Sequence, residues 1–350
     1  MAMAHSRHSV RTGQRLQTAL AIAVCKVEVP VAPTGKKRSG SSSLQRALCT
    51  HSNCGLAPPG SLDSIVDACK GTDRAEAGRE YTFATFADAM ADRRILPEVA
   101  SLVVAHRGAS VSHPENTLAA FEAALATGAE VLELDVRLSE DGVPVVLHDP
   151  DVRRSTDGSG FVHELTLAQL KRLDAAPGQA ERAQIPTLAE VLELASGRAG
   201  VDLEIKNIPG EPAFDSPREA IVEATVRELQ AAAFVGDVMI SSFNWISIER
   251  SRELAPDVPT GFLTIAAVEA GAALVYARGA GHEWILPQVD AVMRTGPSLL
   301  QEAHESGIRV GTWVVDDEPS LETLFGWGID ALATNDPKLA MEVRSRVAGR

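Results

Sequence analysis

Several features that mark particular classes of protein are missing from most of this 350-residue sequence. No cysteine follows Cys69, so residues 70–350 can use neither disulfides nor thiolate metal ligands. No hydrophobic run approaches the length of a membrane-spanning helix, and we therefore expect no stable membrane insertion. Basic residues are in the minority, and the net charge of −14 argues against a broad basic face that grips nucleic acid. The excess carboxylates suit solubility or the holding of cations.

The excess of acid lies entirely after residue 100. Residues 1–100 carry 13 Lys and Arg against 9 Asp and Glu, whereas residues 101–350 carry 20 against 38. The first 60 residues contain a single acid, Glu28, and the low-complexity run GKKRSGSSS. We therefore divide the chain into an N-terminal extension, 1–100, which we expect to be poorly ordered, and a main domain, 101–350.

Three explanations fit the composition of the extension. We favour an upstream extension of the reading frame with Met90 as the working start, which makes a cytoplasmic protein the expectation. A signal peptide is the second explanation, because basic residues precede the apolar run ALAIAVC at 19–25, although that run is short and no clear cleavage site ends it. The third is an organellar transit peptide, since the segment is rich in Arg and poor in acids. An exported or organelle-targeted form thus stays open.

From residue 102 onward, short β-branched runs alternate with helical patterns, which is typical of a parallel sheet. About eight such units in roughly 250 residues match the size of a closed (β/α)8 barrel. The rival is an open sheet that binds nucleotides, but no G-x-G-x-x-G or G-K-[ST] loop follows the first strand. The expected strands are 102–106, 131–138, 143–148, 201–206, 237–243, 260–264, 284–287, 309–315 and 330–334.

We therefore predict an α/β fold, a (β/α)8 TIM barrel with a small insertion after the second barrel strand, preceded by a poorly ordered N-terminal region. The insertion is expected within 149–186, the least regular part of the domain, where STDGSG predicts a turn.

Two carboxylates share one face of the run VLELDVRL. Residues two apart on a strand point the same way, so Glu133 and Asp135 lie opposite the leucines beside them. Inside a barrel the two would repel each other and would be expensive to desolvate without a partner. A hard divalent cation, which prefers oxygen ligands, resolves both problems. An edge strand with a solvated acidic face would explain this pair equally well on its own.

The same pattern recurs in VDLEIKN. Glu204 and Lys206 share a face, and a local salt bridge is the simplest explanation. If the two strands lie in one barrel, Glu204 can supply a third carboxylate ligand, and Lys206 a cation beside an anionic substrate. Asp202 lies lower on that face and receives no role.

Histidines end two of the expected strands. His106 follows LVVA and His148 follows VPVVL. At the same end of neighbouring strands and beside carboxylates, two histidines suit paired general acid and base catalysis near neutral pH. Asp149 could orient His148, although adjacent residues seldom face the same way. We expect the remaining histidines of the domain to be surface or structural residues, among them His163, His282 and His304.

The case depends on convergence, because each of these residues alone has a simpler explanation. The candidates all fall in the C-terminal halves of expected strands, the end where barrel enzymes build their active sites. They are His106, Glu133, Asp135, His148, Glu204 and Lys206.

With these residues identified, the chain from about 102 to 342 resembles the glycerophosphodiester phosphodiesterase family. The matching elements, in the family's order and spacing, are HRGAS, PENT, ELDVRLSEDGVPVVLHD, RRSTDGSG, IPTLAEVLE and LEIK, with later echoes in SSFN, TWVVD and TNDP. Such a long series is far more specific than a single short motif. The tetrapeptide TNDP stands where the family often has T-D-x-P, which leaves the role of Asp336 open.

The resemblance implies a (β/α)8 barrel that hydrolyses glycerophosphodiesters, small-molecule substrates, to sn-glycerol 3-phosphate and an alcohol. It also implies one divalent metal ion, Mg²⁺ or Ca²⁺, and says nothing of the oligomeric state. The implied roles are metal ligands for Glu133, Asp135 and Glu204; acid and base for His106 and His148; phosphate contacts for Arg107 and Lys206; support of the first histidine for Glu115; and an aromatic wall beside the glycerol for Trp313.

Two alternatives stay open. The same site could act on a lysophospholipid or another bulky phosphodiester, which needs an apolar approach to the barrel mouth; an aromatic content of 4% and the lack of an obvious membrane-binding helix do not indicate one. A barrel that has lost catalysis and serves as a binding module is the other, but it would be expected to lack some catalytic positions, and every matching position is filled.

Overall fold

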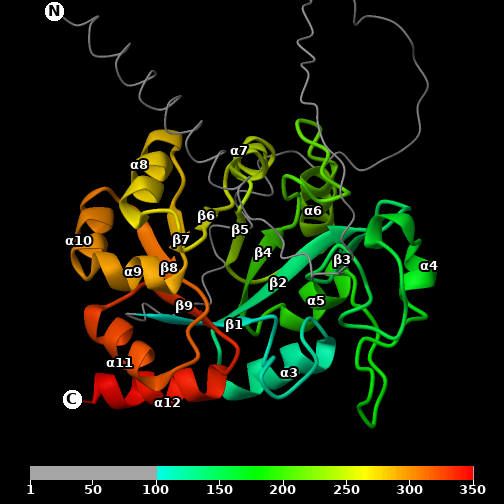
Figure 1. Ribbon diagram of the computed structural model, residues 1–350, viewed down its shortest axis with the longest axis horizontal. Helices are drawn as coiled ribbons and strands as arrows, with labels where there is room; N and C mark the ends of the chain where they lie inside the picture. The colour runs from blue at the N-terminus through cyan, green and yellow to red at the C-terminus, as the bar shows by residue number, and fades with distance from the viewer. Residues whose placement is uncertain (1–100, 350) are drawn as a thin grey trace, which may run out of the picture. The chain divides into compact units, whose positions relative to one another are not determined.

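The computed structural model describes residues 101–349, and the expectations for the N-terminal extension lie outside the described residues. Within this part, eight parallel strands close a barrel because β1 pairs with both β2 and β9 (Figure 1). The strands are β1 Leu102–His106, β2 Val131–Leu138, β4 Gly200–Ile205, β5 Val238–Ser242, β6 Thr260–Thr264, β7 Trp284–Pro287, β8 Arg309–Thr312 and β9 Ala331–Thr334. The predicted (β/α)8 barrel is therefore confirmed.

Helices connect successive strands and cover the outside of the barrel (Figure 1). They are α3 Leu118–Thr127, α5 Leu188–Ala195, α6 Ala220–Ala231, α7 Trp245–Leu254, α8 Ala270–Ala280, α9 Val289–Thr295, α10 Ser298–Glu305, α11 Glu318–Trp327 and α12 Pro337–Ala348. At the start of α3, α5, α7, α9, α11 and α12, a side chain accepts a hydrogen bond from a free backbone N–H group. At the start of α5, for example, Thr187 and Glu190 form a reciprocal capping box. No helix in this part of the chain is both long and apolar enough to span a bilayer.

The insertion after the second barrel strand is also present. It contains β3 Pro144–Val146, the 3₁₀ turn η3 Val162–Glu164 and the short helix α4 Leu167–Leu170, which pack around a small apolar core of their own. The strand expected at 143–148 is shorter than predicted, and it is not a barrel strand. β3 runs antiparallel to β2 and forms a hairpin with it.

Alternation along β2 and β4 separates an apolar outer face from a charged inner face. Leu132 and Leu134 on β2 and Leu203 on β4 pack under the helices, in the larger of the barrel's apolar clusters. The intervening residues point inward, and the parallel register sets Glu133 opposite Asp202 and Asp135 opposite Glu204. Apolar side chains fill the rest of the barrel interior: Val104, Val131, Leu263, Trp284, Leu286 and Ala331.

Gly108 holds the turn that leaves β1. Its φ is +84°, and a Cβ at this position would lie 2.6 Å from the backbone carbon of Ala120 in α3. We expect Gly108→Ala to lower the free energy of unfolding by about 2–4 kcal/mol, because left-handed strain adds to overpacking against a backbone that cannot move aside. Gly142→Ala is the matched control, since Gly142 has φ +75° with no atom within 4 Å and should lose only about 1 kcal/mol. Denaturant titration measures both; equal losses would contradict this account of Gly108.

His282 is the buried structural histidine of the domain. Its Nδ1 lies 2.7 Å from Thr260 Oγ1 at the start of β6, and burial, with help from Arg252, lowers its pKa from 6.5 to about 4. Between pH 6.5 and about 4, His282 is therefore protonated in the unfolded chain and neutral in the folded chain. The stabilisation from keeping His282 neutral and buried is fully present above pH 6.5, and the free energy of unfolding decreases as the pH falls from 6.5 to about 4.

We expect His282→Asn, which can keep the bond to Thr260, to remove about 2–3 kcal/mol of the loss of unfolding free energy between pH 7 and pH 4. Denaturant titrations at several pH values, with the wild type in parallel, measure the difference. An unchanged pH dependence would show that His282 is protonated equally in both states.

Candidate active site

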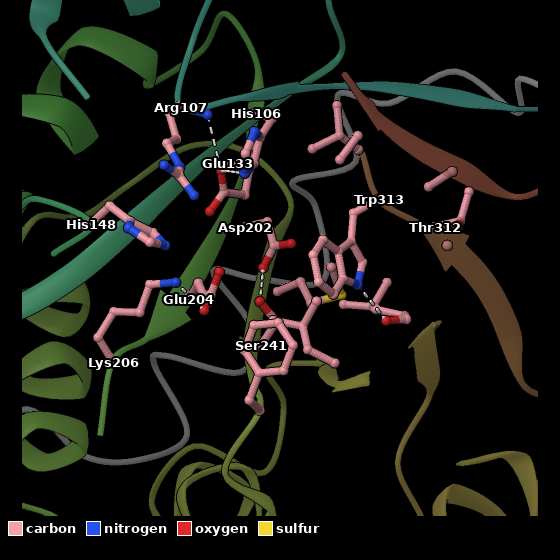
Figure 2. Close-up of a pocket in the computed structure, with 18 residues that line it drawn as sticks. His106, Arg107, Glu133, His148, Asp202, Glu204, Lys206, Ser241, Thr312 and Trp313 are labelled. Carbon is pink, nitrogen blue, oxygen red and sulfur yellow. Dashed lines mark hydrogen bonds and ion pairs between the residues drawn. The ribbon is translucent and has the colours of Figure 1, made fainter. Parts of the chain in front are cut away.

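A pocket of about 250 Å³ opens into the barrel where the carboxyl-terminal ends of its strands meet. Figure 2 shows its charged side chains gathered on one side, with Trp313 across from them. The charged wall comes from β1, β2, β4 and the loop after β3, and the apolar wall from the segments of β5 to β9 together with Val104 of β1. The pocket is lined on the charged side by His106, Arg107, Glu133, His148, Asp202, Glu204 and Lys206, and on the apolar side by Val104, Met239, Phe243, Leu263, Leu286 and Trp313, among others.

Three buried carboxylates converge at the charged wall. Glu133 and Asp135 from β2 and Glu204 from β4 each offer an oxygen, and these oxygens lie within 4.8 Å of one another. The register of the two strands produces this arrangement, since Asp135 and Glu204 are direct neighbours. The sequence-predicted ligand set is thus brought together in one place.

Two cations lie among these carboxylates. Lys206 Nζ is 2.8 Å from Asp135 Oδ1 and in direct contact with Glu204 Oε1. Arg107 Nε is 3.1 Å from Asp135 Oδ2, which also accepts a hydrogen bond of 2.7 Å from Asn116 Nδ2. Burial alone would raise the pKa of Asp135, but Lys206 and Arg107 outweigh it and hold that pKa well below its usual range.

The other carboxylates are poorly neutralised. Burial, reinforced by Asp135 and Glu204, raises the pKa of Glu133 well above its usual value. Burial also raises the pKa of Glu204 and brings that of Asp202 to about 7, although Ser241 donates a hydrogen bond of 2.7 Å to Asp202. Two cations against four carboxylates leave two of the carboxylates inside the barrel without a counter-charge, and in the absence of a metal these groups tend to bind protons.

These residues fit a divalent cation. Glu133 Oε1 is buried and has no hydrogen-bond partner in the described part of the chain. The donor set consists of carboxylate oxygens alone, and hard cations such as Mg²⁺ and Ca²⁺ prefer such ligands. A divalent charge would also match the uncompensated charge of the cluster.

His106 ends β1 and is held by residues that the sequence analysis missed. Its Nδ1 lies 2.7 Å from Asn335 Oδ1, and Asn335 Nδ2 donates to Asp316 Oδ2 at 2.6 Å. Because Asp316 fixes the amide, the ring nitrogen Nδ1 carries the hydrogen, and Nε2 points toward Glu133, 4.0 Å from its Oε2. Burial, with a smaller effect from Arg107, lowers the pKa of His106 to about 4.

The motif TNDP therefore acts through Asn335. Asp336, whose role the sequence left open, caps the N-terminus of α12 by accepting a hydrogen bond from the Leu339 N–H. The sequence does mark this segment, because TNDP stands where the family often has T-D-x-P. The motif does not tell which of its two adjacent polar side chains, Asn335 or Asp336, turns toward the barrel.

His148 reaches the pocket by an unexpected route. It follows an antiparallel strand, so the expectation of a second histidine at the end of a parallel strand is wrong. The β2–β3 hairpin instead brings the chain back to the level of Asp135, whose carbonyl accepts a hydrogen bond from Leu147 N at 3.0 Å. Asp149 does orient this histidine: the His148 Nδ1 to Asp149 Oδ1 distance is 2.6 Å. Burial and Lys206 lower the pKa of His148.

The other predicted residues surround this centre. Arg107 adopts a left-handed conformation, with φ 58°, and its backbone N–H donates to Glu133 Oε2 at 2.9 Å. Its side chain donates to Glu115 Oε1 at 3.0 Å, so Glu115 contacts the arginine and not the first histidine itself. Trp313 packs edge-on against Phe243, with ring centroids 5.2 Å apart, and is fixed by a hydrogen bond from Nε1 to Leu286 O.

The fold and the site together define a barrel enzyme whose pocket combines carboxylates, cations and histidines. The chain belongs to the Glycerophosphoryl diester phosphodiesterase family, whose sequence profile matches residues 106–339. It is 34% identical over 249 residues to the glycerophosphodiester phosphodiesterase of Caldanaerobacter subterraneus subsp. tengcongensis, covering 68% of this chain and 95% of that one. The predicted family and the predicted class of enzyme are confirmed.

Further relatives agree. A glycerophosphodiester phosphodiesterase of Bacillus subtilis is 32% identical over 261 residues, which cover 69% of this chain and 86% of the relative. Among solved structures, a phosphodiesterase from Oleispira antarctica in complex with the product sn-glycerol 3-phosphate superimposes with a TM-score of 0.63 at 28% identity, covering 73% of this chain and 99% of that one.

The uncompensated charge of the carboxylate cluster predicts binding of one divalent cation. We expect isothermal titration of the metal-free full chain to show a single site for Mg²⁺ or Ca²⁺, and Glu133→Gln to weaken it at least about tenfold. Binding should also raise the melting temperature, because the ion binds the folded state alone. Glu122→Gln is the control, since Glu122 pairs with Arg198 on the outer surface. Equal binding by both variants would place the ion elsewhere.

Proposed function

We propose that the protein is a metal-dependent phosphodiesterase that hydrolyses glycerophosphodiesters to sn-glycerol 3-phosphate and an alcohol. The observation that carries the proposal is the convergence of three buried carboxylates and two oriented histidines on one pocket. The relative crystallised with sn-glycerol 3-phosphate supports the choice of substrate. A small molecule of this size suits a pocket of about 250 Å³.

Glu133, Asp135 and Glu204 would hold the metal, with Mg²⁺ and Ca²⁺ the two candidates that suit an all-oxygen donor set. When bound, the ion supplies a positive charge that stabilises the negative charge growing on the phosphate oxygens. Arg107 and Lys206 lie against the same carboxylates. Both line the pocket, so each can contact a phosphate oxygen while its other contacts keep it in place.

The two histidines would divide the proton transfers. Hydrogen bonds at Nδ1, to Asn335 for His106 and to Asp149 for His148, leave Nε2 of each ring for the reaction. One ring would deprotonate the attacking oxygen, which comes from water or from a neighbouring substrate hydroxyl; in the second case water would then open the cyclic phosphate that forms. The other would protonate the leaving alkoxide as the bond from phosphorus to that oxygen breaks.

The apolar wall would position the glycerol. Trp313 lies opposite the charged wall and packs edge-on against Phe243, and its hydrogen bond to Leu286 fixes the indole plane (Figure 2). Such a surface suits the carbon face of a small polyol, whose hydroxyl groups remain free for polar contacts.

We expect the full chain, supplied with Mg²⁺ or Ca²⁺, to release sn-glycerol 3-phosphate from glycerophosphocholine, and excess EDTA to abolish turnover. His148→Ala should lower kcat by about 10²–10⁴-fold while the far-UV circular dichroism stays unchanged. His304→Ala is the control, because His304 pairs with Asp330 away from the pocket. An enzymatic assay for sn-glycerol 3-phosphate measures the rates. Near-normal turnover by His148→Ala, or full activity in EDTA, would refute the assignment, and a preference for lysophosphatidylcholine would change the substrate class.

A further inference from the structure

Arg154 belongs to the insertion, in the turn that carries the motif RRSTDGSG. It is not among the residues that line the pocket. All three nitrogens of its guanidinium group nevertheless contact carboxylates beside the active site. Nη1 and Nη2 donate to the two oxygens of Glu115 at 2.9 and 2.7 Å, and Nε donates to Asp149 Oδ2.

Each of these carboxylates contacts a residue of the proposed reaction. The second oxygen of Asp149 is 2.6 Å from His148 Nδ1. Glu115 Oε1 accepts a hydrogen bond of 3.0 Å from Arg107, which in turn lies against Asp135. A continuous chain of charged contacts thus joins the acid–base histidine to the phosphate-facing arginine, and Arg154 is its central member.

The geometry requires an arginine. A planar guanidinium can hold one carboxylate through two parallel hydrogen bonds and a second one through Nε, whereas a lysine offers a single charged point. The side chain of Arg154 is 48% exposed, so its ion pairs should stabilise the fold little. Its effect should instead be on the orientation of the groups that it joins.

We propose that Arg154 is a positioning residue, which fixes His148 through Asp149 and Arg107 through Glu115. The inference rests on the proposed function, since Arg154 acts through residues that take part in the proposed reaction. Misplacement of a reacting group by about 1 Å can lower the rate about 100-fold. The insertion would therefore supply part of the order of the active site through Arg154, a residue that does not itself line the pocket.

The test compares Arg154→Ala with Arg153→Ala. The neighbouring Arg153 is a matched control because its side chain is 70% exposed and it pairs with Asp151. With glycerophosphocholine as substrate, we expect Arg154→Ala to lower kcat at least about tenfold, with a far smaller change in melting temperature, and Arg153→Ala to match the wild type. Arg154→Lys should recover only part of the loss. Added guanidinium at millimolar concentration should restore kcat in Arg154→Ala, because the site is open to solvent. Equal kcat in the Arg153 and Arg154 variants would overturn the proposal.

A second test combines Arg154→Ala with Asp149→Asn. If Arg154 acts through Asp149, kcat of the double variant should fall by less than the product of the two single fold-losses, whereas independent roles would give the full product. If Arg154→Ala gives the full product both with Asp149→Asn and with Glu115→Gln, the proposed coupling is overturned.

The ¹⁵N NMR spectrum of the histidine rings reads the positioning without turnover. The His148 signals, assigned by their absence in His148→Ala, should shift in Arg154→Ala and not in Arg153→Ala. If the wild type cleaves no glycerophosphodiester and the His148 signals still shift in Arg154→Ala, the proposed function is refuted and the positioning role is upheld. Unchanged His148 signals would refute the positioning role whatever the activity.

Discussion

The burial of carboxylates on two adjacent strands is the constraint on which the rest of this site depends. The parallel register of β2 and β4 forces Asp135 against Glu204, and Glu133 against Asp202, in a space without bulk water. Desolvation of this kind is unfavourable unless charge of the opposite sign is close. Lys206 lies close to two of these carboxylates, and the cluster still has more carboxylates than cations. We propose that a divalent cation supplies the missing positive charge, held by carboxylates that the two strands keep in place.

The histidines differ from the carboxylates in how they are held. Each ring is fixed at Nδ1 by one side chain, and that side chain is itself fixed by another. Asp316 orients the amide of Asn335, and Arg154 contacts the carboxylate of Asp149. Two successive hydrogen bonds are needed because both histidines lie at the end of a strand or a hairpin. There the backbone restrains a side chain less than it does in mid-strand.

Sequence alone could predict the barrel and most of its charged wall. Period-two alternation identifies the inner face of a strand, so it placed Glu133 and Glu204 correctly without knowledge of their neighbours. It could not give the direction of β3, because a run of three apolar residues is the same in a parallel and an antiparallel strand. Helix α8 carries little signal in the sequence, since its glycines and many alanines weaken the helical pattern of polar and apolar faces. Asn335 was missed because its role depends on a contact with Asp316, which no local pattern encodes.

The insertion explains why a barrel of eight strands is not enough for this site. In the barrel β2 is flanked by β1 and β4, and the second histidine comes from a segment outside the eight barrel strands. The β2–β3 hairpin reverses the chain at the rim, so that His148 returns to the level of Asp135 and lies between Arg107 and Lys206 at the charged wall (Figure 2). The residues that follow the hairpin, Asp149 and Arg154, then hold that histidine in the returning segment. The insertion, which looks irregular in sequence, is thereby anchored to the barrel through its charged residues.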